Sequence, residues 1–452
     1  MSTQHQGVAG TAPGQPPATS GGNLLAFAGP LRLYALAAVF ALVWVSPTPF
    51  SDRTASRYFL ADGDANLTSS VINISVCLLA LLVGLAVRGD LLRKAYNHLL
   101  AITIGWCAFC SVISLEPSLS IRRFVLLLLV VMMAQAALIL PASARQFAQV
   151  LTALALAITA VCFASLLIAP GLGVHQPNDL EEPLLAGDWR GIFIHKNTAG
   201  AIMAQFTFLG ILAARIYSRQ LGILLTGLAL IFLWGSGSKT ALLLLPLSLL
   251  IAHALMGQRS LASRALLVLP PILALNLFTV GSVVWSWVKQ LDAKFLPDPS
   301  FTGRDQIWLF AIEKLWQRPL TGYGFLAFWR TPSILYGGAG DLPSRQEGVD
   351  ATVTLSSQSH NGYLDTAVTI GFPGVALTVA LLVLKPILDS GYAELSDSNK
   401  ALKLFFIQNW IFAISCAGLE AYFFDRTDSL WFMLLFSTFG LGALASRNPR
   451  AS

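Results

Sequence analysis

Long apolar segments recur along almost the whole chain, and they restrict the fold more than any other feature. About twelve of them approach the ~20 residues that a helix needs to cross a bilayer. Helices are required because lipid offers no partner for backbone N–H and C=O groups. We therefore predict an all-α polytopic membrane protein with about twelve transmembrane helices and one large external loop that carries short helices. The segments lie near residues 31–47, 68–87, 98–114, 124–140, 147–169, 197–216, 220–235, 240–256, 264–288, 364–385, 402–419 and 428–445.

The composition and the two ends of the chain agree with this prediction. Charged residues make up 12% of the chain, about half of the share that is usual in soluble domains. Residues 1–22 are rich in Gly, Pro, Ser, Thr and Gln, so we predict a disordered cytoplasmic tail. They lack the features of a signal peptide, and the first apolar segment is expected to stay as a membrane anchor. Residues 23–445 then form a single transmembrane domain, and residues 446–452 form a cytoplasmic C-terminal tail.

Basic residues in the short connections orient the chain, because cytoplasmic loops carry an excess of Lys and Arg. The connections with Arg93, Arg215 and Lys400 are assigned to the cytoplasm, which places residues 289–363 in a large loop on the opposite side. An even number of helices places both termini in the cytoplasm. The opposite side also carries basic residues, against the usual bias. Those considered for a role other than topology are Arg190, Lys196, Lys239, Arg304 and Arg330, whereas Arg122 and Arg123 receive no role.

An amphipathic helix is predicted inside the large loop. Thr302 suits its N-cap, Asp305 its first turn and Pro319 its end. Two interpretations of its apolar face remain open: the helix lies on the membrane interface, or its rings and others in the loop stack on sugars. The face comprises Ile307, Trp308, Ala311, Ile312 and Leu315 at helical spacing, and the rings considered for sugar stacking are Trp308, Tyr323 and Trp329.

Three segments that end on the external side could form a basic pocket around a pyrophosphate. They are residues 187–200, residues 235–240 and the large loop with Arg304 and His360. Arg suits phosphate because its planar fork donates two parallel hydrogen bonds, while Lys acts as a point charge. The glycine-rich sequence at 235–240 lacks the spacing of a P-loop, and no strand precedes it, so a nucleotide site is not expected.

His360 lies at the mouth of an apolar helix, where a histidine that is neutral near pH 7 can accept a proton during catalysis. Each candidate residue also has a structural alternative. In those alternatives Arg190 pairs with Asp188, Lys196 reaches a lipid headgroup, His195 and Asn197 cap the helix that follows them, and His360 orients the loop.

Five short motifs occur in an order that is typical of one superfamily of membrane proteins. They are WRGxFxHKN at 189–197, GSGSK at 235–239, GRxxxW at 303–308, GYGF at 322–325 and SHNGYL at 359–364. On these motifs the chain resembles the O-antigen ligase and Wzy-type polysaccharide polymerase superfamily over about residues 120–440. Within it, the HKN and GYGF stretches are most similar to the exopolysaccharide-production branch.

This resemblance implies a function and a set of site residues. Such proteins transfer a glycan from undecaprenyl diphosphate to an acceptor hydroxyl at the periplasmic face of the bacterial inner membrane, with no cofactor and no metal. By motif match, His360 is the catalytic residue that activates the acceptor, and Arg190 and Arg304 bind the donor diphosphate. Lys239 is assigned to the same role, although ligase-like members usually carry Arg there. The supporting residues are His195, Lys196, Asn197, Asn361 and Asp305.

Polymerase, ligase and transporter remain separate hypotheses. A polymerase joins lipid-linked repeat units, and a chain-length regulator is then a candidate partner; a ligase moves a finished glycan to lipid A-core or another acceptor. The exopolysaccharide-like motifs and Lys239 favour the polymerase. A lipid-linked glycan flippase is disfavoured, because transporters usually place ionisable residues near the membrane midplane, whereas here they gather at one side.

Overall fold

The protein is almost wholly α-helical in the computed structural model, which confirms the predicted all-α class. The structure describes residues 21–45, 49–50, 67–94, 97–179, 183–295, 301, 303–329, 331, 334, 353, 356–391 and 395–446. These ranges contain no β-strand, only an isolated bridge between Val174 and Trp189. Of the two predicted tails, residues 1–20 and 447–452 lie outside the described residues, as do Thr302 and Arg330.

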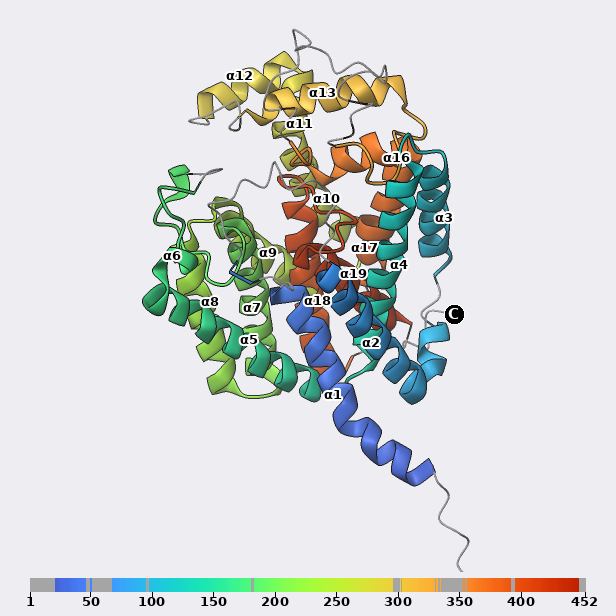
Figure 1. The fold of residues 1–452 in the computed structure, drawn as a ribbon, viewed down its shortest axis with the longest axis vertical. Helices are drawn as coiled ribbons and strands as arrows, with labels where there is room; N and C mark the ends of the chain where they lie inside the picture. Colours follow the sequence, from blue (N-terminus) through green and yellow to red (C-terminus); the bar gives the residue numbers. More distant parts are fainter. Residues whose placement is uncertain are drawn as a thin grey trace, which may run out of the picture.

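The helices follow one another as labelled in Figure 1. The first half of the chain forms α1 (Gly21–Val45), α2 (Leu67–Lys94), α3 (His98–Val112), α4 (Pro117–Ile139), α5 (Ala144–Ile168), α6 (Pro170–Gly173), α7 (Lys196–Ile216) and α8 (Arg219–Ser236). The second half forms α9 (Lys239–Met256), α10 (Leu261–Phe278), α11 (Val280–Val284), α12 (Ser286–Phe295), α13 (Arg304–Gln317), α16 (Gly362–Val379), α17 (Lys385–Asp389), α18 (Asp397–Cys416) and α19 (Ser429–Ala445).

Among the described residues, seven helices are long and apolar enough to cross a membrane, by length and composition. They are α4, α5, α7, α8, α9, α10 and the helical stretch Gly362–Asp389, which includes α16 and α17 and is kinked at Gly371. Shorter apolar helices lie within α1, α2, α3 and α19, and α18 is buried along most of its length. Each predicted apolar segment overlaps one of these helices, so the chain is a polytopic membrane protein.

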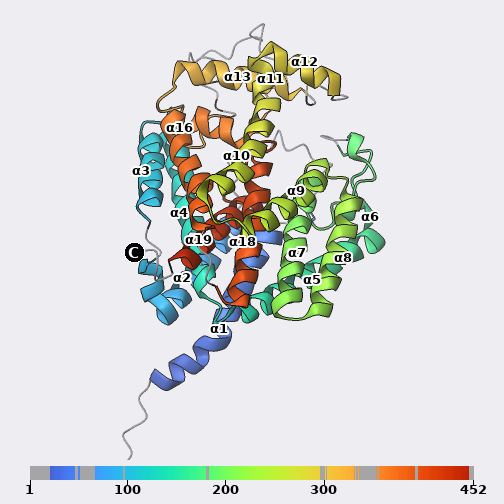
Figure 2. The same cartoon turned by 180° about the vertical axis from the view of Figure 1, so that it is seen from behind.

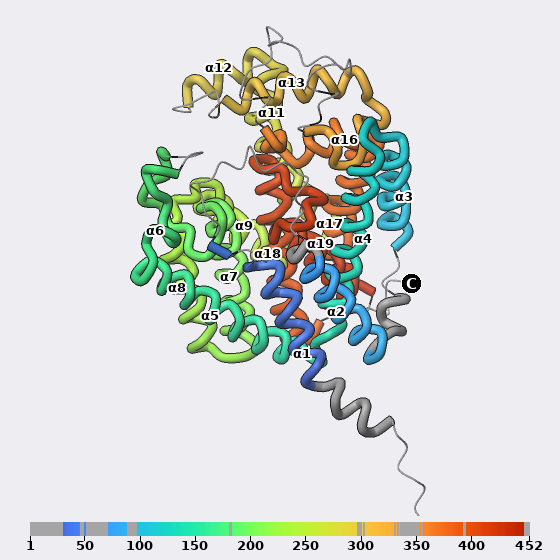
Figure 3. The backbone as a smooth tube through the Cα atoms, in the orientation of Figure 1, coloured from blue at the N-terminus to red at the C-terminus, as the bar shows by residue number. Residues whose placement is uncertain are grey.

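The predicted span at residues 264–288 is wrong in its length. α10 ends at Phe278, because the backbone leaves helical geometry at Thr279 (φ −103°, ψ −93°), whose hydroxyl donates back to Leu275 O at 2.7 Å. The short helix α11 then leads to α12, and Figures 1 and 3 show α12 and α13 lying across one end of the bundle. A layer of short helices therefore covers the end at which the predicted site residues lie.

The centre of the bundle is formed by α18 and α19 (Figures 1 and 2), with α7 packed against α18. Of the candidate spans α7 is the most enclosed, with 78% of its apolar window buried. Gln205 in α7 accepts a hydrogen bond from Trp44 Nε1 at 2.9 Å and donates to Ser429 Oγ at 3.4 Å. This polar link ties α1, α7 and α19 together, because a buried amide is costly unless it is hydrogen-bonded.

The apolar face of α13 packs inward. Ile307, Trp308, Ala311 and Leu315 are buried as the helical spacing predicts, and they face α11 and α16. The interpretation that this face lies on the membrane interface is therefore wrong, because protein already covers it. The residue before the helix is Gly303, whose φ of +84° is available to glycine without strain.

The GYGF motif docks onto a break in α16. Tyr323 N and Gly324 N each donate at 3.0 Å, to Val368 O and Thr369 O respectively. These carbonyl groups are available because Gly371, with a φ of +72°, interrupts the helix just beyond them. The motif therefore links the segment that follows α13 to the middle of α16 through two backbone hydrogen bonds.

Gly322→Ala is expected to destabilise the protein by at least about 2 kcal/mol. Gly322 has a φ of +63°, where an L-residue costs about 1–2 kcal/mol, and an added Cβ would lie 2.5 Å from the backbone carbon of Thr369. The thermal midpoint of the purified variant measures the effect. Gly227→Ala is the matched control, because nothing lies within 4 Å of its added Cβ; equal midpoints for the two variants would contradict this assignment.

Candidate active site

The candidate site forms at the turn that follows α18, where backbone carbonyl groups need hydrogen-bond donors. The carbonyl groups of residues 417–419 accept, in that order, from Gly362 N at 2.7 Å, Asn361 Nδ2 at 3.1 Å and Arg304 Nη1 at 2.9 Å. The cation of Arg304 also suits the negative end of the helix dipole. The end of α18 thus brings the first residue of α13 and the start of α16 together.

Glu420 joins three of the predicted site residues through one carboxylate. Its Oε1 accepts from Arg304 Nη2 at 3.3 Å and from Asn197 Nδ2 at 3.4 Å, and its Oε2 lies 3.1 Å from His360 Nδ1. Burial alone would raise the pKa of Glu420, but the hydrogen bond with His360 and the charge of Arg304 outweigh it and lower the pKa to about 2. Glu420 is therefore ionised at neutral pH.

The contact with Glu420 decides which nitrogen of His360 carries a proton. An ionised carboxylate can only accept hydrogen bonds, so Nδ1 donates to Glu420 Oε2 over the 3.1 Å that separates them. In the neutral ring the lone pair then resides on Nε2. The side chain of His360 is 28% exposed, which leaves this ring accessible to a substrate.

The backbone of His360 is held in a strained conformation. Its φ is +53°, a region that a residue other than glycine enters at a cost of about 1–2 kcal/mol. The preceding residue is fixed on both sides: Ser359 N donates to Asp365 Oδ1 at 2.9 Å, and Ser359 O accepts from Trp308 Nε1 at 2.8 Å. Strain of this kind persists where the surroundings determine the conformation, and here they aim the imidazole at Glu420.

Asn361 fixes the other side of His360. Its Oδ1 accepts from the backbone N–H of Tyr363 at 3.1 Å and of Leu364 at 3.0 Å, which caps α16. Its Nδ2 donates to Asn276 Oδ1 at 3.0 Å, and the side chain is buried. Asn361 therefore positions His360 rather than facing a substrate.

Asn197 connects this site to the other two predicted segments. Its Nδ2 reaches Glu420, and its Oδ1 accepts from Ser238 Oγ at 3.3 Å. His195 precedes α7 and caps it, because its Nδ1 accepts from Asn197 N at 3.0 Å. The structure thus brings residues 187–200, residues 235–240 and the large loop together, and the structural alternative for His195 is confirmed.

The other basic residues occupy three different environments. Lys196 Nζ forms an ion pair with Asp188 Oδ2 at 2.7 Å, so Asp188, which was considered as a partner of Arg190, is engaged by Lys196. Lys239 is exposed at the start of α9, and the side chain of Arg304 is 27% exposed. Both cations are therefore accessible from outside the protein.

Arg190 is buried, and its predicted contact with diphosphate is corrected. The residue is 3% exposed, and its Nε donates to Leu172 O at 2.9 Å. A guanidinium enclosed in this way is not presented to a phosphate. Its position next to the turn at residues 171–173 indicates a role in holding that turn.

The three rings considered for sugar stacking lie in the protein interior. Trp308 is 1% exposed, Tyr323 6% and Trp329 9%. Trp308 Nε1 donates to Ser359 O, Tyr323 Oη to Gln317 Oε1 at 3.0 Å, and Trp329 Nε1 to Asp365 Oδ1 at 2.6 Å. A buried ring has no free face for a sugar, so Trp308 and Tyr323 hold neighbouring segments in place instead of stacking on a sugar. Trp329 borders a cavity.

Asp305, predicted as a supporting residue, makes a local contact. Its Oδ1 accepts from Gln306 N at 3.0 Å in the first turn of α13. Within the described part of the chain, no group of three or more His, Cys, Asp or Glu side chains is arranged to hold a metal ion. The absence of a metal in the reaction stays a prediction.

Glu420 was not among the residues singled out from the sequence. Its signal was present, because it directly follows the apolar segment at 402–419 on the side of the membrane that carries His360 and Arg304. A carboxylate at a helix end is common, however, and only the fold places it against His360.

The family comparison follows the same part of the molecule. Residues 221–379 match the family described as O-antigen ligase, a range that runs from α8 to the end of α16 and contains Lys239, Arg304 and His360. No curated protein matches the chain. Asn197 and Glu420 lie outside the matched range and come from flanking helices. The matched residues are therefore similar to the O-antigen ligase family, which agrees with the superfamily that the motifs of this chain resemble.

Proposed function

We propose that this protein transfers a glycan from an undecaprenyl-diphosphate-linked donor to an acceptor hydroxyl at the periplasmic face of the bacterial inner membrane. The family implies a ligase or polymerase activity of the glycosyltransferase kind. The contact between His360 Nδ1 and Glu420 Oε2, 3.1 Å apart, carries the proposal. It supports a histidine that is oriented by a carboxylate and whose Nε2 can take a proton, the arrangement that general-base catalysis requires.

The reaction proposed is a single displacement. His360 Nε2 accepts the proton of the acceptor hydroxyl while that oxygen forms a bond to the anomeric carbon of the donor sugar. The bond from the anomeric carbon to the diphosphate oxygen breaks, and undecaprenyl diphosphate leaves with the bonding electrons. Lys239 and Arg304 stabilise the negative charge that grows on this leaving group. One displacement implies inversion at the anomeric carbon.

Arg304→Lys is expected to lower kcat/KM for the lipid-linked donor about 10-fold or more. The fork of Arg304 reaches Leu419 O and Glu420 Oε1 at once, with Nη1 and Nη2, and a single ammonium group cannot reproduce this geometry. Loss of one charge-assisted hydrogen bond costs about 1.5–3 kcal/mol. Steady-state kinetics with a defined donor measure the change, and Arg122→Lys, an exposed position on α4, is the control. Unaltered kinetics in the Arg304 variant would remove this residue from the site.

The side of the membrane is tested by labelling. Trp316 is 68% exposed on α13, and the five cysteines of the chain are all buried, so background reaction with a thiol reagent is expected to be low. Trp316→Cys should react with a membrane-impermeant maleimide in intact cells, whereas Gly257→Cys, after α9, should react only in permeabilised cells. The reverse pattern would place the site in the cytoplasm and contradict the proposed function.

Within this function we propose polymerisation rather than ligation. Support comes from the exopolysaccharide-like motifs and from Lys239 where ligase-like members usually carry Arg. Deletion of the gene should leave single repeat units on the lipid and no long chains, since a polymerase leaves its product on the carrier. Long chains that accumulate on undecaprenyl diphosphate in the deletion strain would favour the ligase instead. A chain-length regulator is the partner expected for a polymerase.

A further inference from the structure

A cavity lies beside the Glu420–His360 pair, between α4, α16 and the connection from α18 to α19. Its volume is about 310 Å³, at the low end of the range for small-molecule sites. Its wall includes Ala421, which follows Glu420, and Gln358, which lies two residues before His360. The cavity therefore adjoins the candidate active site through both of the segments that carry the pair.

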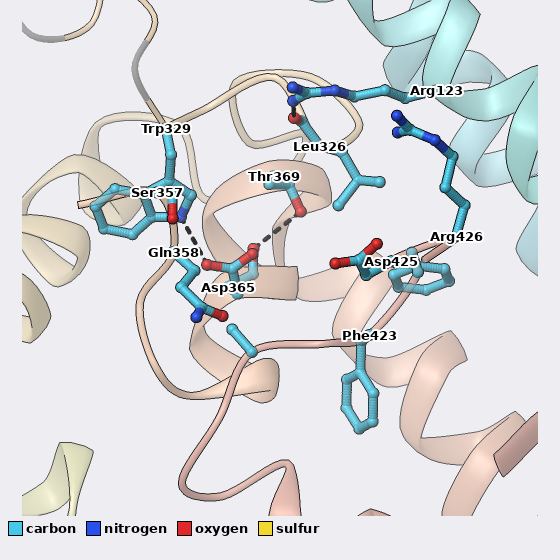
Figure 4. A pocket seen from close by; sticks show the side chains of 12 residues that line it. Arg123, Leu326, Trp329, Ser357, Gln358, Asp365, Thr369, Phe423, Asp425 and Arg426 are labelled. Carbon is cyan, nitrogen blue, oxygen red and sulfur yellow. Dashed lines mark hydrogen bonds between the residues drawn. The ribbon is translucent and has the colours of Figure 1, made fainter. Parts of the chain in front are cut away.

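Two guanidinium groups gather at one end of this cavity. Arg123 from α4 and Arg426 from the α18–α19 connection both line the cavity, and in Figure 4 their side chains lie on the same side of it, with Arg123 extending to Leu326. Arg123 Nη1 donates to Leu326 O, which fixes its position, and Arg426 is exposed. Each guanidinium has five N–H donors in a planar fork that matches a carboxylate.

The remainder of the cavity offers hydrogen-bond acceptors and apolar walls. Asp365 lies away from the two arginines in Figure 4, and Asp425 lies between Asp365 and the arginines. Asp365 Oδ1 already accepts from Trp329 Nε1 at 2.6 Å, while Asp425 Oδ1 accepts from Thr427 N at 2.9 Å. A carboxyl group can accept more than one hydrogen bond, so both can also accept from sugar hydroxyl groups. A ring with a carboxylate at one end and hydroxyl groups at the other fits this distribution.

We propose that the cavity is a subsite for an acidic sugar of the acceptor glycan, whose carboxylate lies between Arg123 and Arg426. This inference rests on the proposed function, since it assigns one substrate of the same site. The acceptor is favoured over the donor because the two oxygens of Glu420 face different regions: one faces the residues assigned to the donor diphosphate, and the other faces His360 on the side of the cavity. Its Oε1 faces Asn197 of α7 and Arg304, near the residues assigned to diphosphate, whereas Oε2 faces His360. His360 directly precedes Asn361, the N-cap of α16, and α16 borders the cavity.

Direct binding to the purified protein tests the subsite without any transfer reaction. The probe is a glucuronate-containing trisaccharide, compared with the same trisaccharide after reduction of its carboxylate to an alcohol. We expect the wild-type protein to bind the acidic probe about 10-fold more tightly than the reduced one. Arg426→Gln should abolish this preference and leave binding of the reduced probe unchanged. Arg122→Gln is the matched control, because Arg122 is an exposed neighbour of Arg123 that does not line the cavity.

Two further results separate this inference from the proposed function. His360→Ala should retain the preference for the acidic probe while it loses transfer. The subsite and the proposed catalytic role of His360 can therefore each fail without the other. Equal binding of both probes by the wild-type protein, or a preference that survives Arg426→Gln, would overturn the subsite. Displacement of the acidic probe by phosphatidylglycerol micelles, but not by phosphatidylcholine micelles, would also overturn it and assign the arginines to a lipid headgroup.

Discussion

His360→Ala is expected to lower the rate of glycan transfer by about 10²–10⁴-fold, the range typical for the loss of a general base, without reducing the amount of protein in the membrane. The imidazole is partly exposed and contacts Glu420 through Nδ1 at 3.1 Å, so its removal leaves the packing of α16 intact. The capping of α16 by Asn361 is also unaffected. Single-turnover rates with a lipid-linked donor, measured on purified protein, give the effect directly.

His253→Ala is the matched control for this variant. His253 is an exposed histidine on α9, with Nδ1 2.8 Å from Leu249 O one turn earlier. Its removal should leave the transfer rate unchanged. Transfer at a near-normal rate by folded His360→Ala would return His360 to the alternative in which it only orients the loop.

Glu420→Gln should lower kcat for transfer by about 10²-fold or more while it changes the KM for the donor little. A glutamine amide can donate as well as accept, so it no longer requires the proton of His360 to reside on Nδ1. Loss of the carboxylate behind a catalytic histidine is costly for this reason in other enzymes. Glu313→Gln, an exposed position on α13, is the control. A change confined to the donor KM would assign Glu420 to substrate binding instead.

The pH dependence of the same variant gives a second measurement. The pKa of Glu420 falls from an ordinary value of 4.5 to about 2. The stabilisation by its ionised form is therefore present above about pH 4.5 and is lost only as the pH falls toward 2. Between pH 5 and 8 the wild-type carboxylate therefore stays charged. The difference in thermal midpoint between the wild-type protein and Glu420→Gln should be constant over this range; a difference that changes between pH 5 and 8 would contradict an ionised Glu420.

The helices could be predicted from the sequence because each membrane span must bury a long apolar run. The ends were less certain. The segment at 264–288 is mostly apolar, and its scattered polar residues, such as Asn276 and Ser282, do not by themselves mark the turn at Thr279 that separates α10 from α11. The inward direction of the α13 face was equally undetermined, since an apolar stripe with tryptophan suits a membrane interface and a protein core alike.

The candidate site was predictable where a residue type has few uses, and not where burial decides its role. His360 and Arg304 lie within one short network, as their motifs indicate. Arg190 and Trp308 belong to equally specific motifs, yet both are buried, and burial depends on contacts with distant segments. Glu420 could be assigned to the site only from the fold, which places the end of α18 beside the start of α16.

The central claim is that the protein catalyses transfer of a glycan from lipid diphosphate through His360. The most direct test uses purified protein in liposomes with lipid-linked repeat units, without nucleotide and without an ion gradient. We predict glycans of increased length and release of one undecaprenyl diphosphate for each bond formed, with both signals lost in His360→Ala. Movement of the lipid-linked units across the bilayer without bond formation would contradict the claim and identify a flippase.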